Sequence, residues 1–114
     1  MKLLPEGQLL RIFIGESDKY KGKPLYEWLV IKAKKDGLAG ATVLRGLMGF
    51  GANCRIHTSK ILRLSLDLPI VVEIVDTPEK IKEFLSCIEN VVKKGLVTLE
   101  KVEFYICSSN NQNE

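Results

Sequence analysis

The chain of 114 residues has 46% hydrophobic and 27% charged residues and a net charge of +3, the balance of an ordinary globular domain. No apolar run approaches the ~20 residues that cross a bilayer, and Pro-Glu-Gly at positions 5–7 interrupts the segment where a signal peptide has its apolar core. The three cysteines are widely spaced and form no CxxC pair, which excludes a disulfide framework and a zinc knuckle; we expect Cys87 and Cys107 to be buried as small apolar residues. These features predict a cytoplasmic protein that is not inserted in a membrane, with one domain over residues 1–107 and a disordered tail at 108–114.

The first half of the chain has a strand, helix and strand pattern. Apolar residues recur at every second position over residues 8–16, the period of a strand. A helix is predicted over residues 24–35, because apolar residues follow at helical spacing and Gly37 can take the left-handed conformation that ends a helix. A second strand is predicted over residues 41–48, and a short extended piece over residues 62–66.

The second half of the chain repeats this alternation with clearer boundaries. Residues 68–75 are rich in β-branched side chains and predict a strand. Thr77 can cap the helix that follows, Pro78 suits its first turn, and the apolar face continues to Val92. The last strand is predicted over residues 96–106, with a bulge or a break between Leu99 and Val102 where the apolar alternation slips.

The element order βαββαβ predicts an α+β, ferredoxin-like fold, in which a four-stranded antiparallel sheet carries both helices on one face. Leu9, Phe13, Val71 and Val75 then direct apolar side chains to the other face. An uncovered apolar sheet face predicts a homo-oligomer whose sheets face inward, whereas scattered surface apolar residues need no partner. The burial of these residues distinguishes the two interpretations.

The segment from residue 37 to residue 60 combines glycine with positive charge. It holds five of the nine glycines, and no Asp or Glu occurs between Asp36 and Asp67. Glycine lets backbone N–H groups approach an anion closely, so the segment is typical of a site for a phosphate-bearing small molecule. A flexible connection in which Gly46 and Gly49 mark bulges accounts for the glycines equally well, and the residues alone leave both interpretations open. The basic residues of this region are Arg45, Arg55, His57, Lys60 and Arg63.

The stretch GLAGATVLRGLMGFG, followed by HTSKILRLSLDLPIVVEIVD, resembles the small PII-like bacterial proteins of undetermined function over residues 10–105. More remotely, the chain is similar to the PII nitrogen-regulatory proteins, in which a GMTV-type strand runs into a GFG turn before a long loop. This resemblance implies a homotrimer that binds an adenine nucleotide such as ATP, ADP or AMP in the cleft between subunits. The residues implied at the ligand are Thr42, Gly49, Phe50, Gly51 and Asn53.

Two departures from the PII pattern limit what the resemblance implies. PII proteins carry a GDGK-like loop after the second helix and arginines near the C-terminus, whereas this chain has Lys93, Lys94 and Gly95 and no later arginine. Lys93 and Lys94 can contact phosphate, but lysines are also typical of a helix C-terminus. The loop is also shorter and has no tyrosine, which argues against its covalent nucleotidylation.

We therefore expect a non-enzymatic signalling protein in which ligand binding orders the loop from Ala52 to Lys60 and changes its contact with a protein partner, such as a transporter or an enzyme. The only histidine, His57, has no acidic residue near it in sequence, and Cys54 with His57 supplies too few ligands for a structural zinc site. One alternative is a nucleic-acid-binding module, since RGLMGFGA is similar to the RNP1 motif, although RNP1 needs several aromatic residues on a central strand. The other is a protein-interaction module without a ligand.

Overall fold

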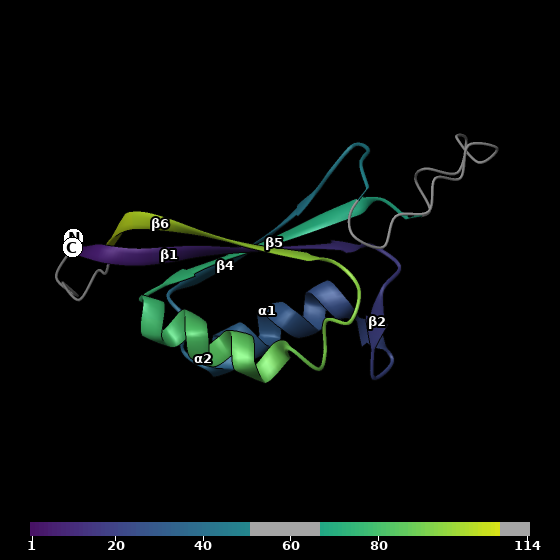
Figure 1. The fold of residues 1–114 in the computed structure, drawn as a ribbon, viewed down its shortest axis with the longest axis horizontal. Coiled ribbons are helices and arrows are strands. Elements are labelled where there is room, and N and C mark those ends of the chain that lie inside the picture. The colour runs from purple at the N-terminus through teal and green to yellow at the C-terminus, as the bar shows by residue number, and fades with distance from the viewer. Residues whose placement is uncertain (51–66, 108–114) are drawn as a thin grey trace, which may run out of the picture.

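The computed structural model describes residues 1–50 and 67–107, which form one layer of sheet and one layer of helices (Figure 1). Sheet order is β4-β5-β1-β6, and every neighbouring pair is antiparallel. This confirms the predicted ferredoxin-like arrangement with both helices on one face. No helix in the described part of the chain has the length and apolar character of a membrane span. The elements are β1 (Lys2–Gly15), β2 (Lys19–Tyr20), β3 (Lys23–Pro24), α1 (Leu25–Lys35), β4 (Gly40–Arg45), β5 (Pro69–Asp76), α2 (Pro78–Ile88) and β6 (Leu96–Ile106).

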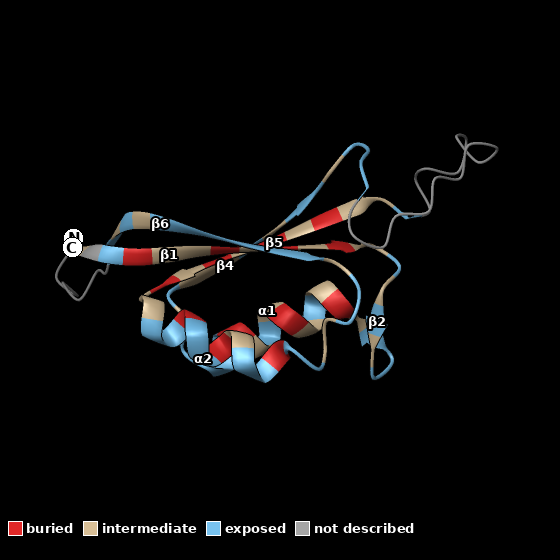
Figure 2. Ribbon diagram, in the orientation of Figure 1, coloured by how far each residue is buried: buried red, intermediate tan, exposed pale blue. Residues whose placement is uncertain are grey.

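The core lies between the sheet and the two helices, where Figure 2 shows the buried residues gathered. Along β5, every second residue from Ile70 to Asp76 is buried, so one face of this strand lies entirely in the core. Burying one Leu, Ile, Val or Phe side chain contributes roughly 1.5–3 kcal/mol, so this layer carries most of the stability. The core residues are Leu10, Ile12, Ile14, Leu25, Leu29, Ala33, Ile70, Val72, Ile74, Ile81, Phe84 and Ile88.

The end of α1 follows the sequence prediction. Gly37 adopts a left-handed conformation with φ of 76°, and its N–H donates to the Lys34 carbonyl at 3.1 Å. The Leu38 N–H donates to the Ala33 carbonyl at 3.0 Å. Together these bonds form a Schellman motif that satisfies the last helical carbonyls and turns the chain toward β4.

The start of α2 was also predicted, but its end was not. The Thr77 hydroxyl accepts a hydrogen bond from the Lys80 N–H at 3.4 Å, and Pro78 opens the helix. The helix ends at Ile88, short of the predicted Val92. Val92 lies just after the turn at residues 89–91, and its N–H still donates to the Ile88 carbonyl at 3.0 Å, so the apolar spacing continues beyond the regular helix.

The predicted bulge in the last strand is wrong. The register irregularity lies in β1, between Leu4 and Gly7, and β6 is continuous opposite it. The apolar residues of β6 change face instead: Leu99 pairs with Leu10 on the helix side, whereas Phe104 lies on the other face, against Gly7.

The structure corrects two further element boundaries and the predicted burial of two cysteines. β1 begins at Lys2 rather than residue 8, and β4 ends at Arg45 rather than residue 48. Cys87 and Cys107 are exposed rather than buried, because Cys87 faces away from the apolar side of α2 and Cys107 follows the end of an edge strand. The short β2–β3 hairpin was not predicted at all. The 62–66 piece and the 108–114 tail lie outside the described residues.

The buried side chain of Asp76 links the end of β5 to the connection between α1 and β4. Asp76 is only 6% exposed, and its carboxylate accepts from the Ala39 N–H at 2.8 Å and from the Thr77 N–H at 2.6 Å. The Lys80 ammonium donates to the Gly37 carbonyl at 2.9 Å across the same junction. The end of β5 therefore holds the connection from α1 to β4.

Replacing Asp76 by Ala is expected to lower the free energy of unfolding by about 2 kcal/mol or more, because two backbone N–H groups lose a charged acceptor. Urea denaturation at one fixed protein concentration measures the change. The exposed Glu83→Ala on α2 is the matched control and should shift stability by no more than about 0.5 kcal/mol. An Asp76→Ala variant as stable as this control would contradict the proposed role.

Candidate functional site

The predicted binding residues that the structure describes lie on β4 and in the turn after it, residues 46–50, called here the glycine turn. Thr42 is exposed on β4 and lies opposite Glu73. The structure thus places five of the ten predicted residues in one short segment at an edge of the sheet. The described members are Thr42, Arg45, Gly46, Gly49 and Phe50, whereas Gly51, Asn53, Arg55, His57 and Lys60 lie outside the described residues and stay predictions.

The glycine turn packs closely on Pro69, the first residue of β5. The Gly46 N–H donates to the Pro69 carbonyl at 2.8 Å, which extends the β4–β5 pairing beyond the end of β4. A Cβ on Gly46 would lie 2.9 Å from Pro69 Cγ, so only glycine fits there without displacement of the ring. Gly49 lies against the same ring, since its Cβ would be 3.5 Å from Pro69 Cγ. The turn is therefore a defined structure at its base rather than a bulge inside a strand.

Arg45, the predicted phosphate contact nearest to the turn, already has a partner. Its guanidinium forms an ion pair with the Glu16 carboxylate, which follows the end of β1. Both side chains remain accessible to solvent, so the pair contributes at most about 1 kcal/mol. An anionic ligand that binds Arg45 must therefore exchange with Glu16.

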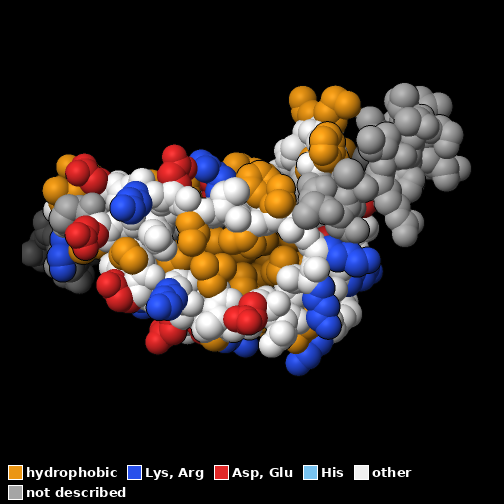
Figure 3. Space-filling view, in the orientation of Figure 1, with side chains coloured by type: hydrophobic (Ala, Val, Ile, Leu, Met, Phe, Trp, Pro, Cys, Tyr) orange, Lys and Arg blue, Asp and Glu red, His pale blue; other side chains and the backbone are white. Residues whose placement is uncertain are grey.

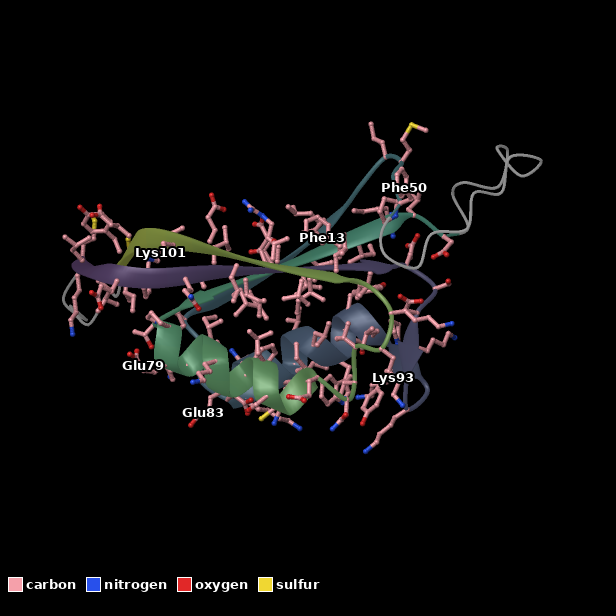
Figure 4. The ribbon with its side chains drawn as sticks, in the orientation of Figure 1. Phe13, Phe50, Glu79, Glu83, Lys93 and Lys101 are labelled. Atoms are coloured by element: carbon pink, nitrogen blue, oxygen red, sulfur yellow. The ribbon has the colours of Figure 1, made fainter. Side chains whose placement is uncertain are left out.

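The outer side of the glycine turn carries large apolar side chains. Leu47 is 93% exposed, Met48 72% and Phe50 76%. Figure 4 shows Phe50 beyond the sheet on the side opposite the helices, and Lys93 on the helix side. Within one chain, Lys93 and the glycine turn therefore do not meet, and the outer side of the turn is apolar.

The sheet face opposite the helices, called here the open face, has one continuous apolar row. The row crosses all four strands and lies next to the glycine turn, since Leu44 precedes Gly46 by two residues. Leu44 is 48% exposed and Leu96 46%, so both ends of the row are accessible. The row consists of Leu44, Val71, Phe13 and Leu96.

A charged network that the sequence analysis missed lies beside this row. Arg11 donates from Nε to Glu73 at 2.9 Å and from Nη1 to Glu100 at 2.9 Å. These two hydrogen bonds raise the pKa of Arg11 above its ordinary value. The sequence shows Arg11 as a single cation among the apolar residues of β1. Its partners Glu73 and Glu100 can be identified only from the pairing of β1 with β5 and β6.

A shallow hollow between α1 and α2 is the other candidate site. Its two lysines are already engaged, because Lys32 pairs with Asp36 at 3.3 Å and Lys80 donates to the Gly37 carbonyl. It lies on the helix side, away from the glycine turn, and we do not assign it a ligand. Its lining residues are Lys32, Asp36, Leu38, Lys80, Glu83, Phe84 and Cys87.

This fold is found in solved structures of PII-like proteins. The structure of CPII from Thiomonas intermedia K12, bound to ADP, AMP and acetate, matches this chain with a TM-score of 0.64 at 17% sequence identity. The match covers 92% of this chain and 93% of CPII. The chain therefore has the PII-like fold, as the resemblance implied.

Sequence comparison identifies the family. Residues 7–104 match the DUF190 family, described as "Uncharacterized ACR". A UPF0166 protein of Aquifex aeolicus is 48% identical over 96 residues, which cover 84% of this chain and 90% of that protein. A UPF0166 protein of Methanocaldococcus jannaschii is 33% identical over 101 residues, covering 88% of this chain and 93% of that protein. The chain belongs to the DUF190 family, a PII-like family of undetermined function.

Proposed function

We propose that this protein is a non-enzymatic PII-like regulator whose copies assemble through the open face, as a trimer, and bind an adenine nucleotide at the seam beside the glycine turn. One observation carries the proposal: the turn that packs on Pro69 lies at the rim of the apolar row. An anion-binding turn therefore borders the surface that a second copy would cover. The ADP and AMP bound to CPII support an adenine nucleotide as the ligand.

The composition of the open face favours a second copy of this chain as its partner. Its apolar row resembles the interior of a protein more than its surface, and the charges beside the row are paired within the chain. An interface of this kind buries the row without leaving Arg11 unpaired. A separate observation argues against a nucleic-acid module: the described part of the RNP1-like motif, with Phe50, lies at the end of the edge strand β4 and in the turn after it, and not on a central strand.

The signalling output is proposed to pass through residues 52–60, which lie outside the described residues, together with the exposed apolar side chains of the glycine turn. Leu47, Met48 and Phe50 are exposed apolar residues that come just before that segment in the sequence. Such residues suit docking on a protein partner, for example a transporter or an enzyme. Nucleotide binding changes this contact only if the nucleotide has different affinities for the two states of the segment.

A charge in the middle of the apolar row should prevent assembly. Phe13→Glu would bring an unpaired carboxylate into the interface, since Arg11 already binds two carboxylates. Size-exclusion chromatography with light scattering should show a folded monomer. The control Ile31→Glu, which changes a 38% exposed apolar residue on α1, should keep the wild-type mass. An unchanged mass for Phe13→Glu would show that the open face is not the interface.

Nucleotide binding is tested by titration calorimetry with ATP, ADP and AMP. The wild-type protein should bind at least one of them, and Gly46→Ala should weaken binding at least about tenfold because its Cβ displaces Pro69 and the turn. Gly40→Ala is the control on the same strand, since its Cβ would make an ordinary contact with Val75 at 3.7 Å. If none of the three nucleotides gives heat, the alternative function, a protein-interaction module without a ligand, is favoured. If Gly46→Ala binds nucleotide as tightly as the wild type, the glycine turn is not the binding site.

A further inference from the structure

The β2–β3 hairpin, residues 19–24, has a turn that its sequence does not favour. Lys21 and Gly22 both adopt positive φ, 52° and 81°, the conformation of a type I′ turn. Asn, Asp or Gly is the usual first residue of such a turn, and a lysine held there is strained. Lys21 thus places a cation at the tip of the hairpin, although its backbone conformation is energetically unfavourable for a lysine.

The hairpin is held rigidly against α1. The Tyr20 ring contacts the Trp28 ring edge-on, with centroids 4.9 Å apart, and the Lys21 ammonium lies 5.4 Å from the Tyr20 centroid. At the base, the Leu25 N–H donates to the Asp18 carbonyl at 2.8 Å. The tip is therefore displayed in one orientation rather than as a flexible loop.

The hairpin and the α2–β6 connection form a basic end of the molecule. Lys19, Lys21 and Lys23 are exposed on the hairpin, and Lys93 and Lys94 are exposed in the connection. Figure 4 shows Lys93 at the same end as β2 and on the same side of the sheet, and Figure 3 shows Lys and Arg side chains gathered there. None of the five lysines forms an ion pair with another described residue.

The carboxylates near the basic end only partly offset its charge. Glu16 pairs with Arg45, the Asp18 carboxylate accepts from the Gly15 N–H at 2.9 Å, and Asp67 accepts from the Ser17 N–H at 3.1 Å. Asp18 and Asp67 keep their charge in these bonds, and two exposed carboxylates lie on the adjoining helix ends, Glu27 and Glu89. The five lysines outnumber these four carboxylates, so the basic end keeps a net positive charge.

The chemistry of this surface favours a broad anionic plane over a single bound anion or a nucleic acid. All five cations are lysines, which act as mobile point charges and do not bind one phosphate in a fixed bidentate geometry. Proteins that bind single-stranded nucleic acid stack bases on exposed aromatic rings, but Tyr20 and Trp28 are half-buried against each other. An anionic bilayer surface attracts lysines without requiring either feature.

We infer that the β2–β3 hairpin, together with Lys93 and Lys94, docks this protein on the surface of a bilayer that contains anionic phospholipid. In a cyclic assembly, equivalent hairpins lie at one level along the symmetry axis, so several can contact a flat surface at once and raise its avidity. This multivalency rests on the assembly proposed above, whereas the charge argument holds for one chain.

The test is co-sedimentation with phosphatidylcholine vesicles, with and without about 30% phosphatidylserine, at about 0.15 M salt. The wild-type protein should bind only the anionic vesicles. The triple variant Lys19→Gln/Lys21→Gln/Lys23→Gln should bind them at least about tenfold more weakly, since each lysine contributes about fivefold. The control Lys34→Gln/Lys35→Gln/Lys82→Gln removes the same charge from exposed helix positions and should bind within about twofold of the wild type.

A single substitution separates binding from folding. Lys21→Asn suits the turn conformation better, so it should raise thermal stability while weakening binding to anionic vesicles. Equal losses in the two triple variants, binding to neutral vesicles, or tighter binding to DNA than to vesicles would each overturn the inference. Calorimetry with nucleotide on the hairpin triple variant keeps the two proposals separate. Normal nucleotide binding together with vesicle binding equal to that of the wild type would contradict the docking inference alone.

Discussion

Two helices cover one face of the four-stranded sheet, and the other face retains a continuous apolar row, from Leu44 at one edge to Leu96 at the other. The functional account depends on this asymmetry. Burying such a row removes apolar surface from water and is favourable. Beside the row, Arg11 pairs with both Glu73 and Glu100, so its charge stays paired when the row is covered. In the proposed assembly, a second copy of the chain covers the row and lies next to the glycine turn.

The position of that turn depends on contacts far from it in sequence. Asp76 holds the Ala39 N–H, and Lys80 holds the Gly37 carbonyl, so the beginning of β4 is fixed by the junction between β5 and α2. The other end of β4 is fixed by the hydrogen bond from Gly46 to Pro69 at the start of β5. Because β5 is a central strand, a ligand that moved the turn would have to break these contacts or act on the residues after Gly46.

Sequence patterns predicted the elements whose boundaries and periodicity are local. The alternation of β5, the Thr77 cap and the Gly37 C-cap each depend on neighbouring residues, and each is found in the structure. The displaced bulge, the exposed Cys87 and the Arg11 network were not predictable in this way, because they depend on which strands pair and which side of a helix meets them. At the candidate site, the sequence predicted the segment around Gly46, but not its packing on Pro69 or the ion pair of Arg45 with Glu16. The role of His57 and its neighbours stays a prediction.

In the proposed assembly, identical chains cover one another's open faces. Native mass spectrometry of the wild-type protein, across a dilution series with and without ATP, measures the number of chains in the complex. We expect a complex of three chains that persists on dilution, with nucleotide retained only by the complex. A single chain at every concentration would contradict it, and so would nucleotide bound stoichiometrically to that single chain.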